Sequence, residues 1–273
     1  MPAVRYEERR ARVADLICDR ILGARSVLAT ALLGADQPHL TARELVEMAS
    51  LFGISDGAAR TCLWRMVSAG ELTTDDGVYT LAGRLLERRQ RVDEAARTDD
   101  TVAAPWDGTW ELAVVSQQRR SASARLALRK AAAALHLAEL REGIWFRPDN
   151  LGRDRLPTLR AVLDRQCVHF HGAATDIPAE TVRSLFDLED WAVDARRLTQ
   201  AMGDELDVEA AGAVGVDDFT YQFALSITVV RHLQLDPLLP AELVPRQWPG
   251  RALRGTYRHF DEVFKQRLNA AFG

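Results

Sequence analysis

The side chains best suited to recognition chemistry lie on a helix that the sequence predicts from Ser55 to Gly70. Its helical period places apolar residues on one face and basic, polar and aromatic residues on the other. A guanidinium can donate two hydrogen bonds to guanine O6 and N7, so Arg60 and Arg65 are the strongest candidates for base contact. Trp64 could contact a base or sugar, or pack against a neighbour. A merely solvated helix face is the alternative. The candidate DNA contacts here are Ser55, Gly57, Arg60, Thr61, Trp64 and Arg65.

A second helix precedes this one. Thr41 with Glu44 three residues on is the pattern of a capping box, and Gly53 supplies the freedom that a tight turn between the two helices needs. The amides and dipole at the start of the first helix favour phosphate, so Thr41 and Arg43 join the candidate DNA contacts.

A hairpin follows the two helices. Residues 71–73 and 78–81 flank a turn at 74–77 and are predicted to form its two strands, because the Asp-Gly pair in that turn is a strong turn signal. Helix, turn, helix and hairpin together predict a winged helix-turn-helix, in which the second helix enters the major groove and the wing follows the backbone. Gly77 in this wing completes the set of candidate DNA contacts.

The rest of the chain predicts an α+β protein. Strands alternate with two helices over residues 110–172, which is typical of a small ferredoxin-like sandwich, and the remainder is mostly helical with a proline-rich interruption at 236–249. We therefore expect a DNA-binding domain at 1–99, a ferredoxin-like domain at 105–177 and a helical domain at 178–273.

The composition is that of a globular chain without a global attraction for nucleic acid. A net charge of -4 over 273 residues means that any DNA binding must come from a local patch. Arg9, Arg10 and Arg12 could add backbone contacts or lie on a solvated helix. With no apolar run of about 20 residues and no secretory signal, we expect a cytoplasmic protein that does not interact with membranes.

Metal and catalytic signals are weak. Cys18, Cys62 and Cys167 lie far apart in apolar segments, which favours buried thiols over disulfides or zinc ligation. His169 and His171 share one face of a predicted strand and could share a metal, but a structural pair is the better interpretation. No Walker, dinucleotide-binding or zincin pattern is present, and we expect neither an enzyme nor a cofactor.

Four blocks of sequence together resemble the PaaX family of bacterial transcriptional repressors. They are residues 52–70, 106–112, 142–148, and 236–245 with 248–250. The resemblance implies an N-terminal winged helix that binds operator DNA, a middle domain similar to the CRISPR-associated Cas2 fold, and a helical C-terminal domain that completes a dimer. Two departures are an acidic, short wing at 73–77 and the bulky Trp64 on the recognition helix.

The resemblance also implies an effector, since repressors similar to the founding member are released from DNA by phenylacetyl-coenzyme A. A small organic acid or its coenzyme A thioester needs cations for phosphate and an aromatic wall for the acyl group. Arg119, Arg120, Trp145 and Arg147 could supply both, although solvated arginines and a core tryptophan are the plainer interpretation. We expect a homodimeric repressor that such a ligand releases from its operator.

Two other classes remain open from the sequence. A Cas2-like metal-dependent nuclease is one, but its acidic residue at the end of the first strand is replaced here by residues 114–117, Val-Val-Ser-Gln. The middle domain is therefore expected to be non-catalytic. A protein-interaction adaptor is the other, and the acidic wing is its one sequence hint.

Overall fold

The computed structural model describes residues 10–11, 13–17, 23–97, 105–173, 177–210 and 218–272. These fall into two compact units, each built from separate stretches of chain. Unit 1 combines Met1–Ala96 with Arg197–Arg231 and Ala252–Gly273, and unit 2 combines Arg97–Arg196 with His232–Arg251. The predicted helical domain at 178–273 is thus divided between both units.

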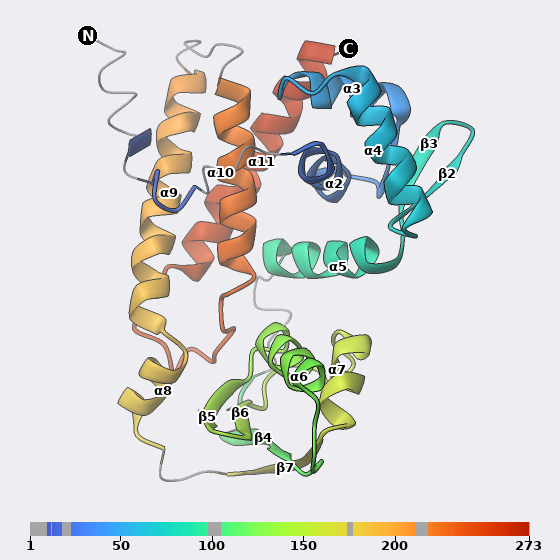
Figure 1. Cartoon of the computed structure of the whole chain (residues 1–273). Coiled ribbons are helices and arrows are strands. Elements are labelled where there is room, and N and C mark those ends of the chain that lie inside the picture. The colour runs from blue at the N-terminus through green and yellow to red at the C-terminus, as the bar shows by residue number, and fades with distance from the viewer. Residues whose placement is uncertain are drawn as a thin grey trace. The chain divides into compact units, whose positions relative to one another are not determined.

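Residues 23–97, nearly all of them in unit 1, form four helices and a small sheet (Figure 1). The strands form an antiparallel sheet in the order β1-β3-β2. The predicted hairpin is confirmed, although its first strand runs further and its turn consists of two residues. The short strand β1 was not predicted. In chain order the elements are α2 (Ala24–Gly34), β1 (His39–Thr41), α3 (Ala42–Ser50), α4 (Asp56–Ser68), β2 (Leu72–Asp75), β3 (Val78–Leu81) and α5 (Gly83–Arg97).

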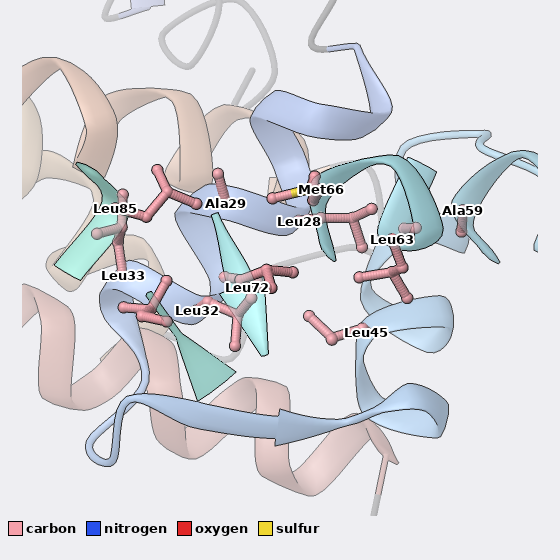
Figure 2. Packing of buried hydrophobic residues seen from close by; sticks show 13 residues of the cluster. Leu28, Ala29, Leu32, Leu33, Leu45, Ala59, Leu63, Met66, Leu72 and Leu85 are labelled. Atoms are coloured by element: carbon pink, nitrogen blue, oxygen red, sulfur yellow. The ribbon is translucent and has the colours of Figure 1, made fainter. Parts of the chain in front are cut away.

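One apolar cluster holds these elements together (Figure 2). Leu28 and Leu32 from α2 meet Leu45 from α3 and Leu63 and Met66 from α4, all of them almost completely buried. Each such side chain contributes on the order of 1.5–3 kcal/mol when removed from water. The cluster therefore fixes which face of α4 is turned inward.

Unit 2 contains a four-stranded antiparallel sheet in the order β5-β6-β4-β7. With the helices between strands, this order confirms the ferredoxin-like prediction. Helices α6 and α7 lie together on the sheet (Figure 1). The elements are β4 (Thr109–Val115), α6 (Ala122–Ala134), β5 (Ala138–Arg141), β6 (Ile144–Pro148), α7 (Pro157–Asp164), β7 (Cys167–Ala173) and α8 (Ala179–Leu185).

The sheet of unit 2 is packed on two sides. Trp145 belongs to one buried cluster, with residues of α6 and α7. Trp110 and Phe146 belong to a second cluster, which Leu239 and Leu243 from the proline-rich segment join. That segment has no helix or strand at 236–249, as predicted. It is anchored by Trp248, whose ring stacks on Trp191 with centroids 4.6 Å apart.

Three long helices complete the structure, α9 (Leu188–Ala210), α10 (Asp218–Leu233) and α11 (Gly250–Phe272). Each contributes residues to both units. Cys62 and Cys167 are free thiols, whereas Cys18 lies outside the described residues. A helix predicted over residues 13–22 is not found at 13–17, which form turns and a bend, and residues 18–22 lie outside the described residues. Among the described helices, none is long and apolar enough to cross a membrane.

Candidate nucleic-acid interface

Helix α4 presents a polar and aromatic face to solvent. Its inner face is fixed by Ala59, Leu63 and Met66, which are 1% exposed or less. The helix begins cleanly because the Ser55 hydroxyl accepts a hydrogen bond from the Ala58 amide at 3.4 Å. Ser55 therefore acts as a cap, and its hydroxyl is engaged. The predicted contact residues all lie on the exposed side: Gly57, Arg60, Thr61, Trp64 and Arg65.

Three side chains at four-residue spacing form a ridge along that face, which we call the α4 ridge: Asp56, Arg60 and Trp64. Arg60 Nε donates to Asp56 Oδ1 at 2.5 Å. Trp64 is 68% exposed, an unusual degree for so large an apolar side chain. The ridge thus combines a carboxylate, a guanidinium and an indole within reach of an incoming partner.

The start of α3 lies beside the wing. Thr41 and Glu44 form the predicted capping box, in which the Thr41 hydroxyl accepts from the Glu44 amide at 3.2 Å and the Glu44 carboxylate accepts from the Thr41 amide at 2.7 Å. The Ala42 amide donates to the Gly77 carbonyl oxygen at 2.9 Å. Arg43 is exposed and pairs with Glu47, Nε to Oε1, at 2.7 Å. The Ala42–Gly77 hydrogen bond places the start of α3 against the wing turn, and Thr41 and Arg43 flank Ala42 in the chain.

The wing itself is short and acidic. Asp76 and Gly77 both have positive φ, 44° and 76°, which is the geometry of a two-residue hairpin turn. The side chains of Asp75 and Asp76 are both exposed at this turn. Because carboxylates repel phosphate, this wing is poorly suited to follow a DNA backbone.

The predicted effector residues do not form one site. Arg119 and Arg120 lie in the loop before α6, where Arg119 is exposed. Trp145 is 7% exposed and packs in the core of unit 2. These positions leave only the two loop arginines accessible to a ligand.

Arg147 requires a correction, because it is a buried structural residue. It is 1% exposed, and its five N–H groups face carbonyl and amide oxygens. Burial, more than the neighbouring charges of Arg155 and Arg160, lowers the pKa of Arg147 to about 9, so it stays charged at neutral pH. Its hydrogen-bond acceptors are the carbonyls of Pro148, Leu135, His136 and Leu238 and the side chain of Asn150. The sequence did not reveal this, since the residues after Arg147 and the loop before β5 had no readable acceptor role, and the carbonyl of Leu238 comes from a distant segment.

The two histidines of β7 have separate carboxylate partners. His169 Nδ1 lies 3.2 Å from Glu111 Oε1, and His171 Nδ1 lies 2.6 Å from Asp149 Oδ2. Glu111 is buried and also accepts hydrogen bonds from Arg160. Among the residues that the structure describes, no cluster of three or more potential metal ligands occurs.

The basic N-terminus is described only in part. Arg10 lies with its guanidinium 4.1 Å from the centroid of the Tyr221 ring, so it packs within unit 1. Arg9 and Arg12 lie outside the described residues. The α4 ridge with the start of α3 therefore remains the strongest candidate surface.

Family models match almost the whole chain in order. The PaaX-like protein model matches residues 23–85, the PaaX protein central Cas2-like domain matches 103–183, and the PaaX-like protein C-terminal domain matches 186–272. The chain belongs to the PaaX-like family. PaaX-like proteins are transcriptional regulators that bind DNA. Membership of this family therefore supports a role of this chain in DNA binding and transcription regulation.

Solved structures include a relative that matches most of this PaaX-like chain. The uncharacterized protein Rv0674 from Mycobacterium tuberculosis is 36% identical, with a TM-score of 0.67, and the match covers 91% of this chain and 98% of that one. No curated protein matches. The similarity extends across both units and supports the family fold without adding a ligand or an operator.

Proposed function

We propose that this PaaX-like chain is a cytoplasmic, homodimeric transcriptional repressor whose two copies of α4 bind a roughly palindromic operator. The observation that carries the proposal is the α4 ridge, which is exposed while the opposite face of the same helix is locked into the core. A two-fold dimer matches two half-sites about one or two helical turns apart. The element order α2-β1-α3-α4-β2-β3 supports use as a winged helix-turn-helix.

The effector in this proposal is a small organic acid or its coenzyme A thioester, with phenylacetyl-coenzyme A as the first compound to test. Arg119 and Arg120 are the candidate phosphate contacts, because Trp145 and Arg147 are buried. Such a ligand can release the repressor only by binding one dimer geometry more tightly than the other.

The deciding experiment measures binding of the purified chain to DNA from upstream of its own coding sequence, against scrambled DNA of equal length. Two salt concentrations separate phosphate contacts from base contacts, since phosphate contacts make affinity fall steeply with salt. Specific binding relieved by phenylacetyl-coenzyme A supports repressor and effector together. Specific binding without relief supports the repressor alone, and magnesium-dependent cleavage or no binding favours the nuclease or adaptor class.

Arg60 and Arg43 provide a matched pair of variants. Arg60→Ala is expected to cost about 1–3 kcal/mol on the specific site and little on scrambled DNA, because a base contact is lost. Arg43→Ala is expected to weaken binding to both DNAs similarly, as a phosphate contact would. Titration on both duplexes, with sedimentation to verify an unchanged oligomer, checks this; equal losses for Arg60→Ala on both duplexes would contradict it.

A further inference from the structure

We propose that Asp56 is a positioning residue for base recognition, which orients Arg60 so that its two terminal nitrogens are presented to guanine. This inference rests on the proposed function and adds to it a specificity-determining residue that makes no DNA contact of its own. Asp56 is the first residue of α4, and in helix-turn-helix proteins the start of the recognition helix is the part that approaches base edges.

The geometry of the ion pair is specific. Arg60 uses Nε, not a terminal nitrogen, to reach Asp56 Oδ1 at 2.5 Å. Both side chains remain more than half exposed, at 59% and 58%. Exposed pairs of this kind contribute little to folding. The main effect available to this pair is therefore on where the guanidinium points.

An arginine can present its fork to guanine in two ways. It can donate from Nε and one terminal nitrogen, or from both terminal nitrogens, and each can satisfy O6 and N7. With Nε donated to Asp56, Arg60 retains only the second arrangement. The ion pair also restricts the rotamers of Arg60 before DNA is bound, so less rotamer entropy is lost on binding.

The chain contains a matched pair elsewhere in the same motif. Arg43 Nε donates to Glu47 Oε1 at 2.7 Å, again at four-residue spacing, but on α3. In the helix-turn-helix arrangement this first helix crosses the backbone, where sequence is not read directly. Removing Glu47 therefore controls for the general effect of deleting a carboxylate beside an exposed arginine.

The test is selection of binding sites from a randomised duplex library by the full-length chain and four variants: Asp56→Ala, Asp56→Asn, Arg60→Lys and Glu47→Gln. The wild type is expected to enrich a motif with guanine at one position of each half-site. Asp56→Ala should reduce the guanine preference at that position by on the order of tenfold. Asp56→Asn keeps an oxygen that accepts from Nε, so it should retain most of the preference.

Arg60→Lys identifies the base pair in question, because an ammonium lacks the planar fork. It should lose preference at the same position as Asp56→Ala, whereas Glu47→Gln should leave the motif unchanged. Circular dichroism and thermal melting verify that each variant folds. If Asp56→Ala does not fold, Asp56→Ser takes its place. The guanine preference of Asp56→Ser is then compared with that of Asp56→Asn, Arg60→Lys and Glu47→Gln.

The outcomes separate the two proposals. If the wild type enriches no motif, the proposed function fails. If it does, but Asp56→Ala enriches the same motif with the same guanine preference, the positioning role is overturned. The positioning role is also overturned if Asp56→Ala and Asp56→Asn both bind all DNA sequences more tightly, and by the same factor. That result would show only that removing the carboxylate relieves its repulsion from phosphate.

Discussion

Glu111 and Arg160 form a buried ion pair, and the partner of each charge determines its effect on stability. Glu111 is 2% exposed on β4, where Arg160 donates to both of its carboxylate oxygens and His169 lies beside it. Burial by itself raises the pKa of Glu111, but the hydrogen bonds and charge of Arg160 outweigh it and lower the pKa below its ordinary value. Removing Glu111 takes away the carboxylate that pairs with the buried Arg160, whereas removing Arg160 leaves Glu111 with His169 beside it.

Glu111→Gln is therefore expected to lower the free energy of unfolding by about 3–5 kcal/mol, because it leaves Arg160 uncompensated. Glu47→Gln removes a carboxylate from an exposed ion pair and should change the free energy of unfolding by less than about 1 kcal/mol. Urea unfolding followed by tryptophan fluorescence measures both. Similar effects of the two substitutions would show that Glu111 is not buried as described.

The same glutamate predicts a pH dependence. A carboxylate whose folded pKa is lowered adds stability above its unfolded pKa of about 4.3, and that contribution is lost as pH falls through the folded pKa. The difference in unfolding free energy between the wild type and Glu111→Gln should be full near pH 6 and shrink towards pH 3. A difference that stays constant over this range would contradict the assignment.

The exposure of a single residue was predictable where the hydrophobic period of its own helix decides which side faces the core. The exposure of Arg60 and Trp64 follows from the amphipathic pattern of α4, since its apolar face must meet the core. Arg147 was not predictable, because β6 is covered on both sides and one of its acceptors is the carbonyl of Leu238. Sequence spacing carries no information about a contact over such a separation.

At the scale of elements, two glycines on either side of the α4 N-terminus differ in backbone conformation, and only one of them needs to be glycine. Gly53 lies between α3 and α4 with φ of 68°, and its amide donates to the Ser50 carbonyl at 3.0 Å. Gly57 lies inside the first turn of α4 with an ordinary helical backbone, and no atom within 4 Å would meet an added Cβ. Only Gly53 needs the left-handed region that glycine adopts easily.

Gly53→Ala is expected to lower the unfolding free energy by about 1–2 kcal/mol, because alanine is strained at this φ. Gly57→Ala should raise it by up to about 1 kcal/mol, since alanine favours the helix. If the α4 face contacts DNA closely, Gly57→Ala should at the same time weaken specific binding. Thermal melts and DNA titration of both variants check this, and a stabilised Gly57→Ala with unchanged affinity would argue against close approach there.

Strand β1 illustrates which elements the sequence leaves undetermined. It has three residues, His39–Thr41, and exists because its backbone pairs with β3. A run this short shows no period of its own, and Thr41 was readable only as the start of the next helix. Helices α3 and α4 were predictable because each has its own cap signal, and the hairpin because of its Asp-Gly turn. The ferredoxin-like sheet was predictable as a type from the alternation of strands and helices.

The whole molecule is built from units that are discontinuous in sequence. The predicted domain at 105–177 ends before the proline-rich segment that supplies Leu239 and Leu243 to its second buried cluster. Cut out alone, its sheet would expose Trp110 and Phe146, which are 3% and 1% exposed in the intact chain. The burial of a single large aromatic side chain is worth several kcal/mol.

We therefore expect a fragment of residues 105–177 to lack a cooperative thermal transition. A fragment of residues 97–251 contains every stretch of unit 2 and should unfold cooperatively. Calorimetry of the two fragments is the measurement. Equally sharp transitions would mean that the proline-rich segment contributes little to this unit.

The discontinuity of unit 1 also affects how the chain folds during synthesis. The core of α2, α3 and α4 is complete once α5 has left the ribosome, so the recognition helix can be formed early. Phe52, however, packs against Phe223, with centroids 4.8 Å apart, and that partner is translated about 170 positions later. At roughly 5–20 residues per second, Phe52 stays exposed on the nascent chain for about 10–30 s. During that interval the emerging polypeptide offers chaperones an aromatic side chain beside a finished recognition helix.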